Sequence, residues 1–374
     1  MISTEYQFPN EPLRFTPRHI DELLTFCTES NASDITFQTN EPVFAEIHGK
    51  LYRITKRRIS NAEVSELLNA IYGPNGTTQI LSGHDVDTHY EFRPSRSSRF
   101  RFRVNGTGCQ VEGHPGLQLT LRTIPTYPPD LASMNLPKAI LDAYAPEDGV
   151  VYVTGSTGSG KSTLLAAIIK EIARNPNCHR KILTYEAPIE FVYDSIDKPT
   201  AIISQSEIPR HLASFAAGVR NALRRKPRLI LVGEARDMET MSAVLEAAMT
   251  GHPVYTTLHS NGVAEVVRRL VGTFPSDERE GRAIDILETI RLVIWQKLEP
   301  SVDGKRVPLR EYLVFDEAVR DELISTHLEN ITSTVRRLLH ERGQPIMVEA
   351  KQKFEEGIIS ERQYNILEKT TKVG

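Results

Sequence analysis

The stretch Gly155-Ser156-Thr157-Gly158-Ser159-Gly160-Lys161-Ser162 fits the P-loop pattern, in which a glycine is followed by four residues and then by Gly-Lys-Ser. The apolar run 150–153 precedes it and a helical pattern over 163–170 follows it, so the stretch has the strand–loop–helix context that the motif requires. Glycines allow backbone N–H groups to surround phosphate oxygens, and the N-terminus of the next helix adds the positive end of its dipole. A plain Gly/Ser-rich turn needs neither the lysine nor the hydroxyl that ends this motif. The stretch therefore predicts a nucleotide-binding protein.

The residues of this motif have distinct expected roles. The amino group of Lys161 would reach the β- and γ-phosphates, and the hydroxyl of Ser162 would ligate Mg²⁺. ATP and Mg²⁺ are the predicted ligands. The predicted nucleotide-binding residues are Gly155, Ser156, Thr157, Gly158, Ser159, Gly160, Lys161, Ser162 and Thr163.

The bulk composition sets wider limits. A chain of 374 residues favours two domains, and 40% hydrophobic with 25% charged residues is ordinary for a globular protein. The net charge of −3 gives no overall field for nucleic acid or an anionic membrane. The cysteines at 27, 109 and 178 form no C-x-x-C pair, which favours a reducing compartment over a disulfide framework or a zinc site. With no signal peptide and no apolar run near the roughly 18–20 residues that span a bilayer, we expect a cytoplasmic protein that reaches a membrane only through partners.

The two halves of the chain differ in pattern. The first half predicts a mixed domain, with helices over about 17–27 and 61–71, strands at 33–37, 43–47 and 51–54, and an all-β stretch from 83 to 125. Three prolines among residues 125–129 indicate a linker. Beyond it, apolar strands at 181–185, 229–232 and 254–258 alternate with amphipathic helices, which predicts an α/β core, and the tail from about Asp316 is helix-rich. The expected domains are residues 1–124, a flexible linker over 125–136, and residues 137–374.

Carboxylates follow two of the predicted strands. Glu234 ends the apolar stretch 229–233 in the Walker B form, and at the edge of a sheet its carboxylate would hold Mg²⁺ through water. Glu186 follows the strand 181–185, where it would polarise the attacking water, and Glu190 is a further candidate. A strand-terminal glutamate can also be plain surface, but the nearby P-loop favours the catalytic interpretation.

Two histidines bracket the strand 254–258. His259 would sense the γ-phosphate or contact a neighbouring subunit, and His252 is an alternative for the same role. A lone histidine is more often structural than catalytic. A metal site at this pair is disfavoured, because no third ligand lies near them in the sequence.

Arginines recur at every second position of the predicted strand 99–104, so that one of its faces is basic. The simpler interpretation is a solvated outer face. The other interpretation is a surface directed at phosphate.

Taken in order, these motifs resemble those of the secretion ATPases of type II and type IV systems, and most closely the pilus-retraction (PilT-like) branch with its Dot/Icm type IVB and conjugative-plasmid relatives. Residues 33–37 resemble the early Ser-Asp-Ile strand of the family, 99–105 its arginine-rich strand, and 121–125 its exit from the first domain. Residues 186–191 resemble the "Asp box", 233–237 the end of Walker B, and 250–252 with 257–259 the "His box".

Two departures from the family pattern are informative. Ala187 replaces the acid that names the Asp box, so only Glu186 and Glu190 can take its role. The basic stretch 224–228 replaces the acidic lead into Walker B that is usual for retraction motors. The second difference favours the secretion or conjugation branch over a plain pilus motor.

The resemblance implies an N-terminal PAS-like α+β domain linked to a C-terminal RecA-like P-loop ATPase domain, with six chains in a ring. It also implies that Arg101, Arg103 and Arg122 reach the nucleotide from the first domain as the domains close. The implied function is ATP hydrolysis that powers protein translocation through a Dot/Icm-like type IV secretion system, at the inner-membrane secretion complex. A pilus retraction motor, a nucleic-acid translocating motor and a nucleotide switch without hydrolysis stay open as alternatives.

Overall fold

The computed structural model describes residues 6–95 and 98–372, and the chain divides into two compact units, Met1–Thr126 and Tyr127–Gly374. Within the described residues, no helix combines the length and the apolar character that crossing a membrane requires.

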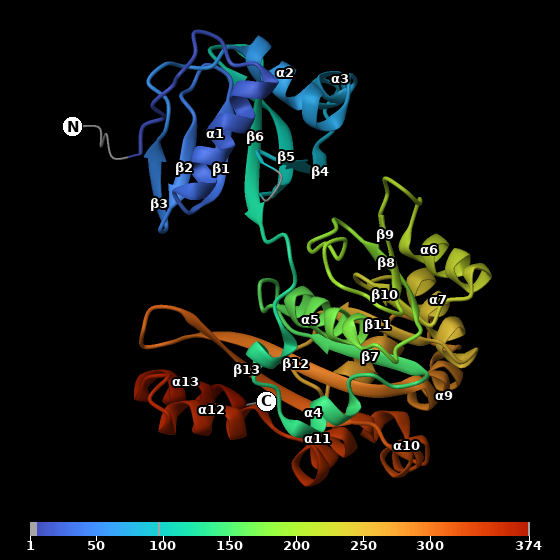
Figure 1. Cartoon of the computed structure of the whole chain (residues 1–374). Helices are drawn as coiled ribbons and strands as arrows, with labels where there is room; N and C mark the ends of the chain where they lie inside the picture. The colour runs from blue at the N-terminus through green and yellow to red at the C-terminus, as the bar shows by residue number, and fades with distance from the viewer. Residues whose placement is uncertain (1–5, 96–97, 373–374) are drawn as a thin grey trace. The chain divides into compact units, whose positions relative to one another are not determined.

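The first unit is an antiparallel sheet covered by helices (Figure 1). Its described strands lie in the order β3-β2-β1-β6-β5-β4. The predicted mixed α+β pattern is confirmed, and the short helix α3 adds to it. The elements are α1 (Pro17–Glu29), β1 (Ala32–Gln38), β2 (Phe44–Ile47), β3 (Lys50–Arg53), α2 (Asn61–Tyr72), α3 (Gly76–Leu81), β4 (Val86–Phe92), β5 (Phe100–Val111) and β6 (His114–Ile124).

Local sequence explains where α2 begins. The Ser60 hydroxyl accepts a hydrogen bond from the Glu63 backbone N–H, and the Glu63 carboxylate accepts one from the Ser60 N–H at 2.9 Å, which is a capping box. The side chains of Val64, Leu67 and Leu68 on one face of the helix are buried in the core of this unit. The pattern of cap and apolar face therefore fixes both the start and the orientation of α2.

The second unit has a largely parallel sheet, with described strands in the order β13-β12-β7-β11-β10-β8-β9. Only β13 among them runs antiparallel to its neighbour. Its strands are β7 (Gly149–Thr154), β8 (Lys181–Glu186), β9 (Ile202–Glu207), β10 (Leu229–Val232), β11 (Pro253–Leu258), β12 (Ile290–Pro300) and β13 (Arg306–Val314). Its helices are α4 (Lys138–Ala143), α5 (Lys161–Arg174), α6 (Phe215–Ala222), α7 (Met238–Met249), α8 (Val266–Val271), α9 (Arg279–Thr289), α10 (Glu317–Ile324), α11 (Ile331–Arg342), α12 (Ile346–Glu355) and α13 (Glu361–Lys372).

The central strand β7 shows why its sequence is continuously apolar. Val150 and Tyr152 pack into the hydrophobic cluster that includes α7 and α9, whereas Val151 and Val153 pack into the cluster that includes α5. Since successive side chains of a strand point to opposite faces, helices cover both faces of the sheet. The expected α/β core is confirmed.

The proline-containing segment after β6 is anchored at its second half. The Lys170 amino group on α5 donates to the Pro128 carbonyl at 2.9 Å and pairs with Asp130 at 2.8 Å, and the Leu131 side chain is buried beside α5. The boundaries at residues 124 and 136, and the flexibility of the linker between them, stay predictions.

Candidate active site

The P-loop connects β7 to α5, which begins at Lys161. Gly155, Gly158 and Gly160 have φ values of +143°, +76° and +82°, in a region that residues with a side chain rarely adopt. Gly160 is the N-cap of α5. The loop glycines therefore supply the conformations that a cradle of backbone N–H groups needs.

Gly155 is also required by close packing. A Cβ at this position would lie 2.2 Å from the Gln296 carbonyl oxygen on β12 and 2.7 Å from the Ser159 hydroxyl. No side chain fits there without moving backbone atoms.

Lys161 is buried, and its ammonium group bonds to the loop itself. Its Nζ donates to the Gly155 carbonyl at 3.0 Å and to the Ser156 carbonyl at 2.8 Å. Burial lowers the pKa of Lys161, and the negative charges of Glu234 and Glu190 oppose that shift. A phosphate group offers the same ammonium charged oxygens in place of neutral carbonyls.

Glu234 follows β10 and is largely buried. Its carboxylate pairs with Arg236 at 2.7 Å, and its Oε1 lies 3.4 Å from Nε2 of His259. Glu234 and His259 follow neighbouring parallel strands, so the topology places them at one edge of the sheet. The structure thus brings these two predicted residues together.

Glu186 ends β8 and is partly buried in a network of polar side chains. Its Oε1 accepts hydrogen bonds from Thr184 Oγ1 at 2.7 Å and from Gln205 Nε2 at 3.1 Å. Burial raises the pKa of Glu186 to about 7, with a smaller raising effect from Glu190, against the lowering effect of these hydrogen bonds. A carboxyl group with this pKa can exchange a proton near neutral pH.

The two histidines lie at opposite ends of β11. His259 follows the carboxyl end, beside Glu234, whereas His252 precedes the amino end and bonds through Nδ1 to the Thr250 hydroxyl and the Ala247 carbonyl, each at 3.1 Å. Six strand residues separate them by roughly 20 Å. Of the two candidates, only His259 is placed beside the phosphate loop.

A cavity of about 630 Å³ opens beside the P-loop. It is lined by Gly155, Ser156 and Thr157 of the loop together with His259, Ser260, Asn261, Glu265, Arg268 and Arg269. A second cavity of about 490 Å³ adjoins Thr157, Glu234, Arg236, His259 and Arg269 among others. The arginines of α8 had no signal in the sequence, because a pair of arginines on an amphipathic helix is typical of a solvated face.

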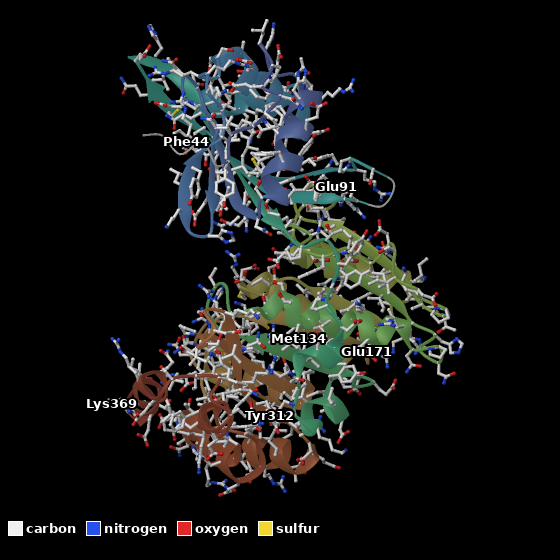
Figure 2. The ribbon with its side chains drawn as sticks, turned by 60° about the vertical axis from the view of Figure 1, so that its left-hand side comes forward. Phe44, Glu91, Met134, Glu171, Tyr312 and Lys369 are labelled. Atoms are coloured by element: carbon white, nitrogen blue, oxygen red, sulfur yellow. The ribbon has the colours of Figure 1, made fainter. Side chains whose placement is uncertain are left out.

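The arginines predicted to reach the nucleotide all belong to the first unit, where each has a carboxylate partner. Arg101 pairs with Glu91 at 3.3 Å (Glu91 is labelled in Figure 2), Arg103 with Asp87 at 2.7 Å and Arg122 with Asp34 at 2.8 Å.

The exposure of these arginines differs. The side chain of Arg101 is only 2% exposed, whereas those of Arg103 and Arg122 are 46% and 68% exposed. The interpretation of this strand as a uniformly solvated basic face is therefore wrong at Arg101.

The donors beside the loop suit a magnesium ion. Ser162 lies in the first turn of α5, and the negative charge of Glu234 acts on the neighbouring Lys161. Hard oxygen donors of this kind are the ligands that Mg²⁺ prefers, and Mg²⁺ commonly takes one or two of them from protein and the rest from phosphates and water. In the described part of the chain, no group of three or more His, Cys, Asp and Glu side chains is arranged for a metal.

Comparison with known proteins gives consistent results. The family model described as "Type II/IV secretion system protein" matches residues 11–353. The crystal structure of the ATPase DotB from Legionella pneumophila is 62% identical to this chain, with a TM-score of 0.84 and 98% of each chain covered. The type IV pilus retraction ATPase PilT of Pseudomonas aeruginosa is 32% identical over 317 residues, which are 85% of this chain and 88% of that protein. A crystal structure of the pilus retraction motor PilT with bound ADP has a TM-score of 0.80 at 29% identity and covers 94% of this chain and 96% of that one.

Proposed function

The chain belongs to the type II/IV secretion system protein family, and from this premise we propose that it powers protein translocation through a Dot/Icm-like type IV secretion system as a ring of six ATPase subunits. Membership confirms the resemblance found in the motifs, and with it the PAS-like first domain and the RecA-like ATPase domain. The chain is an ATP hydrolase. We propose three things beyond this: the secretion machine that the chain drives, its assembly into a ring, and the roles of its individual residues.

The observation that carries the proposed chemistry is the meeting of the P-loop, Glu234 and His259 at one edge of the sheet. The loop N–H groups and Lys161 would hold the β- and γ-phosphates. Ser162 directly and Glu234 through water would hold Mg²⁺, which, when bound, neutralises charge on the phosphate oxygens. His259, held by Glu234, would respond to the presence of the γ-phosphate.

Hydrolysis then needs an activated water. Glu186 would accept a proton as the water oxygen forms its bond to the γ-phosphorus, and the bond from that phosphorus to the bridging oxygen breaks with its electron pair left on ADP. Arg101, Arg103 and Arg122 would stabilise the charge that develops on the γ-phosphoryl group. Because these arginines belong to the first unit, domain closure and hydrolysis would be one coupled event.

The choice of a secretion machine rests on the similarity to the ATPase DotB over nearly the whole chain. A pilus retraction motor is the second candidate, favoured by the similarity to PilT. The decisive experiment replaces the chromosomal copy with a Lys161→Ala variant in the source organism and measures effector delivery and pilus-dependent motility side by side. Loss of delivery with intact motility supports the proposal, and the reverse result supports the retraction motor.

Ring formation has its own test. The mass of the purified chain is measured with and without ATP. A species of six subunits under either condition supports the ring, and a stable monomer under both contradicts it.

A nucleic-acid motor is a less favoured alternative. Its candidate contact surface is the basic cluster 220–228, in which Arg220, Arg224, Lys226 and Arg228 are exposed and therefore accessible to phosphates. Binding through such contacts weakens steeply as salt rises. Absence of measurable binding to single- or double-stranded DNA at low salt excludes this alternative.

A further inference from the structure

Gln296 on β12 is in direct contact with the P-loop. Its side-chain Nε2 donates a hydrogen bond to the Ser159 carbonyl at 2.6 Å, and the residue is only 3% exposed. Its backbone carbonyl is the atom that leaves no room for a side chain at Gly155, and a Cβ on Gly160 would lie 2.9 Å from Nε2. Residue 296 therefore contacts the loop near its start, at Gly155, and near its end, at Ser159 and Gly160.

This hydrogen bond fixes the direction of one peptide group. In a planar trans peptide the C=O and N–H bonds point in opposite directions. With the Ser159 carbonyl held toward β12, the N–H of Gly160 points away from β12, into the loop. Rotation of this peptide would instead present a carbonyl oxygen to a phosphate, which is repulsive.

Arg310 on β13 fixes the orientation of the Gln296 amide. Its Nε donates to Gln296 Oε1 at 2.9 Å, and its side chain is 1% exposed. Because a guanidinium group can only donate, the amide oxygen must face Arg310 and the NH₂ group must face Ser159. The amide therefore cannot turn over without losing both hydrogen bonds.

Glu349 on α12 completes this chain of contacts. Its Oε2 accepts from the Arg310 backbone N–H at 2.5 Å, and its Oε1 lies 3.4 Å from Arg310 Nη1. The helix pair α12–α13 packs against β13 through a separate apolar cluster made of Leu309, Ile346, Ala350, Ile359 and Leu367. Figure 2 marks β13 by Tyr312 and α13 by Lys369. A continuous buried polar path thus joins the C-terminal helices to the P-loop.

We propose that Gln296 is a positioning residue of the phosphate cradle, and that α12 sets nucleotide affinity through Glu349, Arg310 and Gln296. This inference rests on the proposed function only in taking the P-loop as the nucleotide site. Gln296 itself touches the loop rather than the nucleotide.

The first test is Gln296→Glu, measured by ADP binding. The new carboxylate keeps an oxygen for Arg310 but places an oxygen against the Ser159 carbonyl, where a donor stood. We expect the Kd for ADP to rise at least about tenfold. Because a buried oxygen that faces a carbonyl also destabilises the fold, the Kd is measured at a temperature where circular dichroism shows that the nucleotide-free variant is folded like the parent. A Kd within twofold of the parent overturns the inference.

Lys297→Gln is the matched control, since the next residue on β12 points to the opposite face of the strand and pairs with Glu299. Its Kd for ADP should equal that of the parent. If Gln296→Glu does not fold, Gln296→Met takes its place, because it removes the donor without adding charge, and we expect a rise of about three- to tenfold. A parent that binds no ADP would instead refute the proposed function, and the inference with it.

The link to α12 is tested on the unaltered protein. Binding of ADP should slow amide hydrogen exchange in residues 346–355, because a fixed loop restrains Gln296, Arg310 and Glu349 in turn. Residues 317–324 of α10, which carry none of these contacts, provide the internal comparison. If ADP slows amide hydrogen exchange equally in both segments, or does not slow it in residues 346–355, the proposed role of α12 is overturned.

Discussion

Oε1 of Glu234 lies 3.4 Å from Nε2 of His259, and the two residues follow the carboxyl ends of the adjacent parallel strands β10 and β11. Ligands of open α/β sheets bind at this edge of the sheet. The same edge carries the P-loop, because β7 pairs with β11 on its other side. A carboxylate and an imidazole thereby lie at the edge of the sheet that carries the P-loop.

Glu234→Gln should abolish most turnover and leave binding intact. The amide keeps the shape of the side chain but loses the charge that we propose holds Mg²⁺, so we expect kcat to fall about 10²–10⁴-fold. Phosphate release and the Kd for ATP measured on the same sample separate the two effects. Glu239→Gln, at an exposed glutamate of α7, is the control and should keep parental turnover. A Glu234→Gln variant with more than half the parental kcat contradicts the role of this carboxylate.

The raised pKa of Glu186 predicts a pH effect on stability. Its folded-state pKa of about 7 stands above the ordinary value of 4.5, so the folded protein holds this proton more tightly than the unfolded chain does. The resulting stabilisation is complete below about pH 4.5 and is lost as the pH rises to about 7, by roughly 3 kcal/mol for one group. The free energy of unfolding of the nucleotide-free protein should therefore fall between pH 5 and pH 8, and Glu186→Gln should not show this fall. If the free energy of unfolding depends on pH in the same way in the parent and in the variant, the raised pKa of Glu186 is refuted.

The same ionisation predicts the pH dependence of turnover. Only the deprotonated carboxylate accepts a proton from water, so kcat/KM, which reports the ionisation of the nucleotide-free enzyme, should rise as the pH increases through about 7. Glu186→Gln should retain ATP binding, lose most of its turnover and lose this rise. A variant whose pH–rate profile matches the parental one shows that another group is the base.

Local signals in the sequence were enough to predict that several residues of the candidate site lie at one edge of a sheet. Lys161 belongs to a motif with a fixed spacing, and Glu186, Glu234 and His259 each follow an apolar strand, so the parallel topology brings their positions to one edge. The roles of Gln296 and Gln205 had no such signal. Gln296 meets Ser159 across 137 residues of sequence, and only the register of β12 against β7 brings them together.

The fold shows the same division. The continuous apolar runs of β7 and β10 predicted buried parallel strands, whereas β9 has a mixed, partly exposed pattern and was not predicted. Alternation placed Arg101 on the face opposite Phe102. It could not predict that Glu91, on the neighbouring strand, would pair with Arg101 in a buried position, because that depends on the pairing of β4 with β5.

Gly155→Ala should destroy nucleotide binding and destabilise the second unit. The new Cβ would lie 2.2 Å from the Gln296 carbonyl, and φ is +143°, so the loop must shift away from β12. Gly357→Ala is the comparison, since φ is +70° there and no atom lies within 4 Å of the new Cβ. That variant should lose only about 1 kcal/mol from backbone strain and keep ADP binding. Thermal unfolding and ADP titration of both variants check this, and equal ADP affinity in the two would show that the close approach at Gly155 is unimportant.

Arg103→Ala and Arg122→Ala test whether the first unit supplies charge to the reaction. Both side chains are well exposed and their ion pairs with Asp87 and Asp34 contribute little to stability, so neither change should alter folding. An arginine that stabilises the transition state is worth about 10³–10⁵ in rate, so kcat should fall by a large factor while ATP still binds. Arg14→Ala, at an exposed arginine of the same unit that pairs with Glu66, should leave kcat unchanged. Parental turnover in both Arg103→Ala and Arg122→Ala would confine hydrolysis to the residues of the second unit and to Arg101.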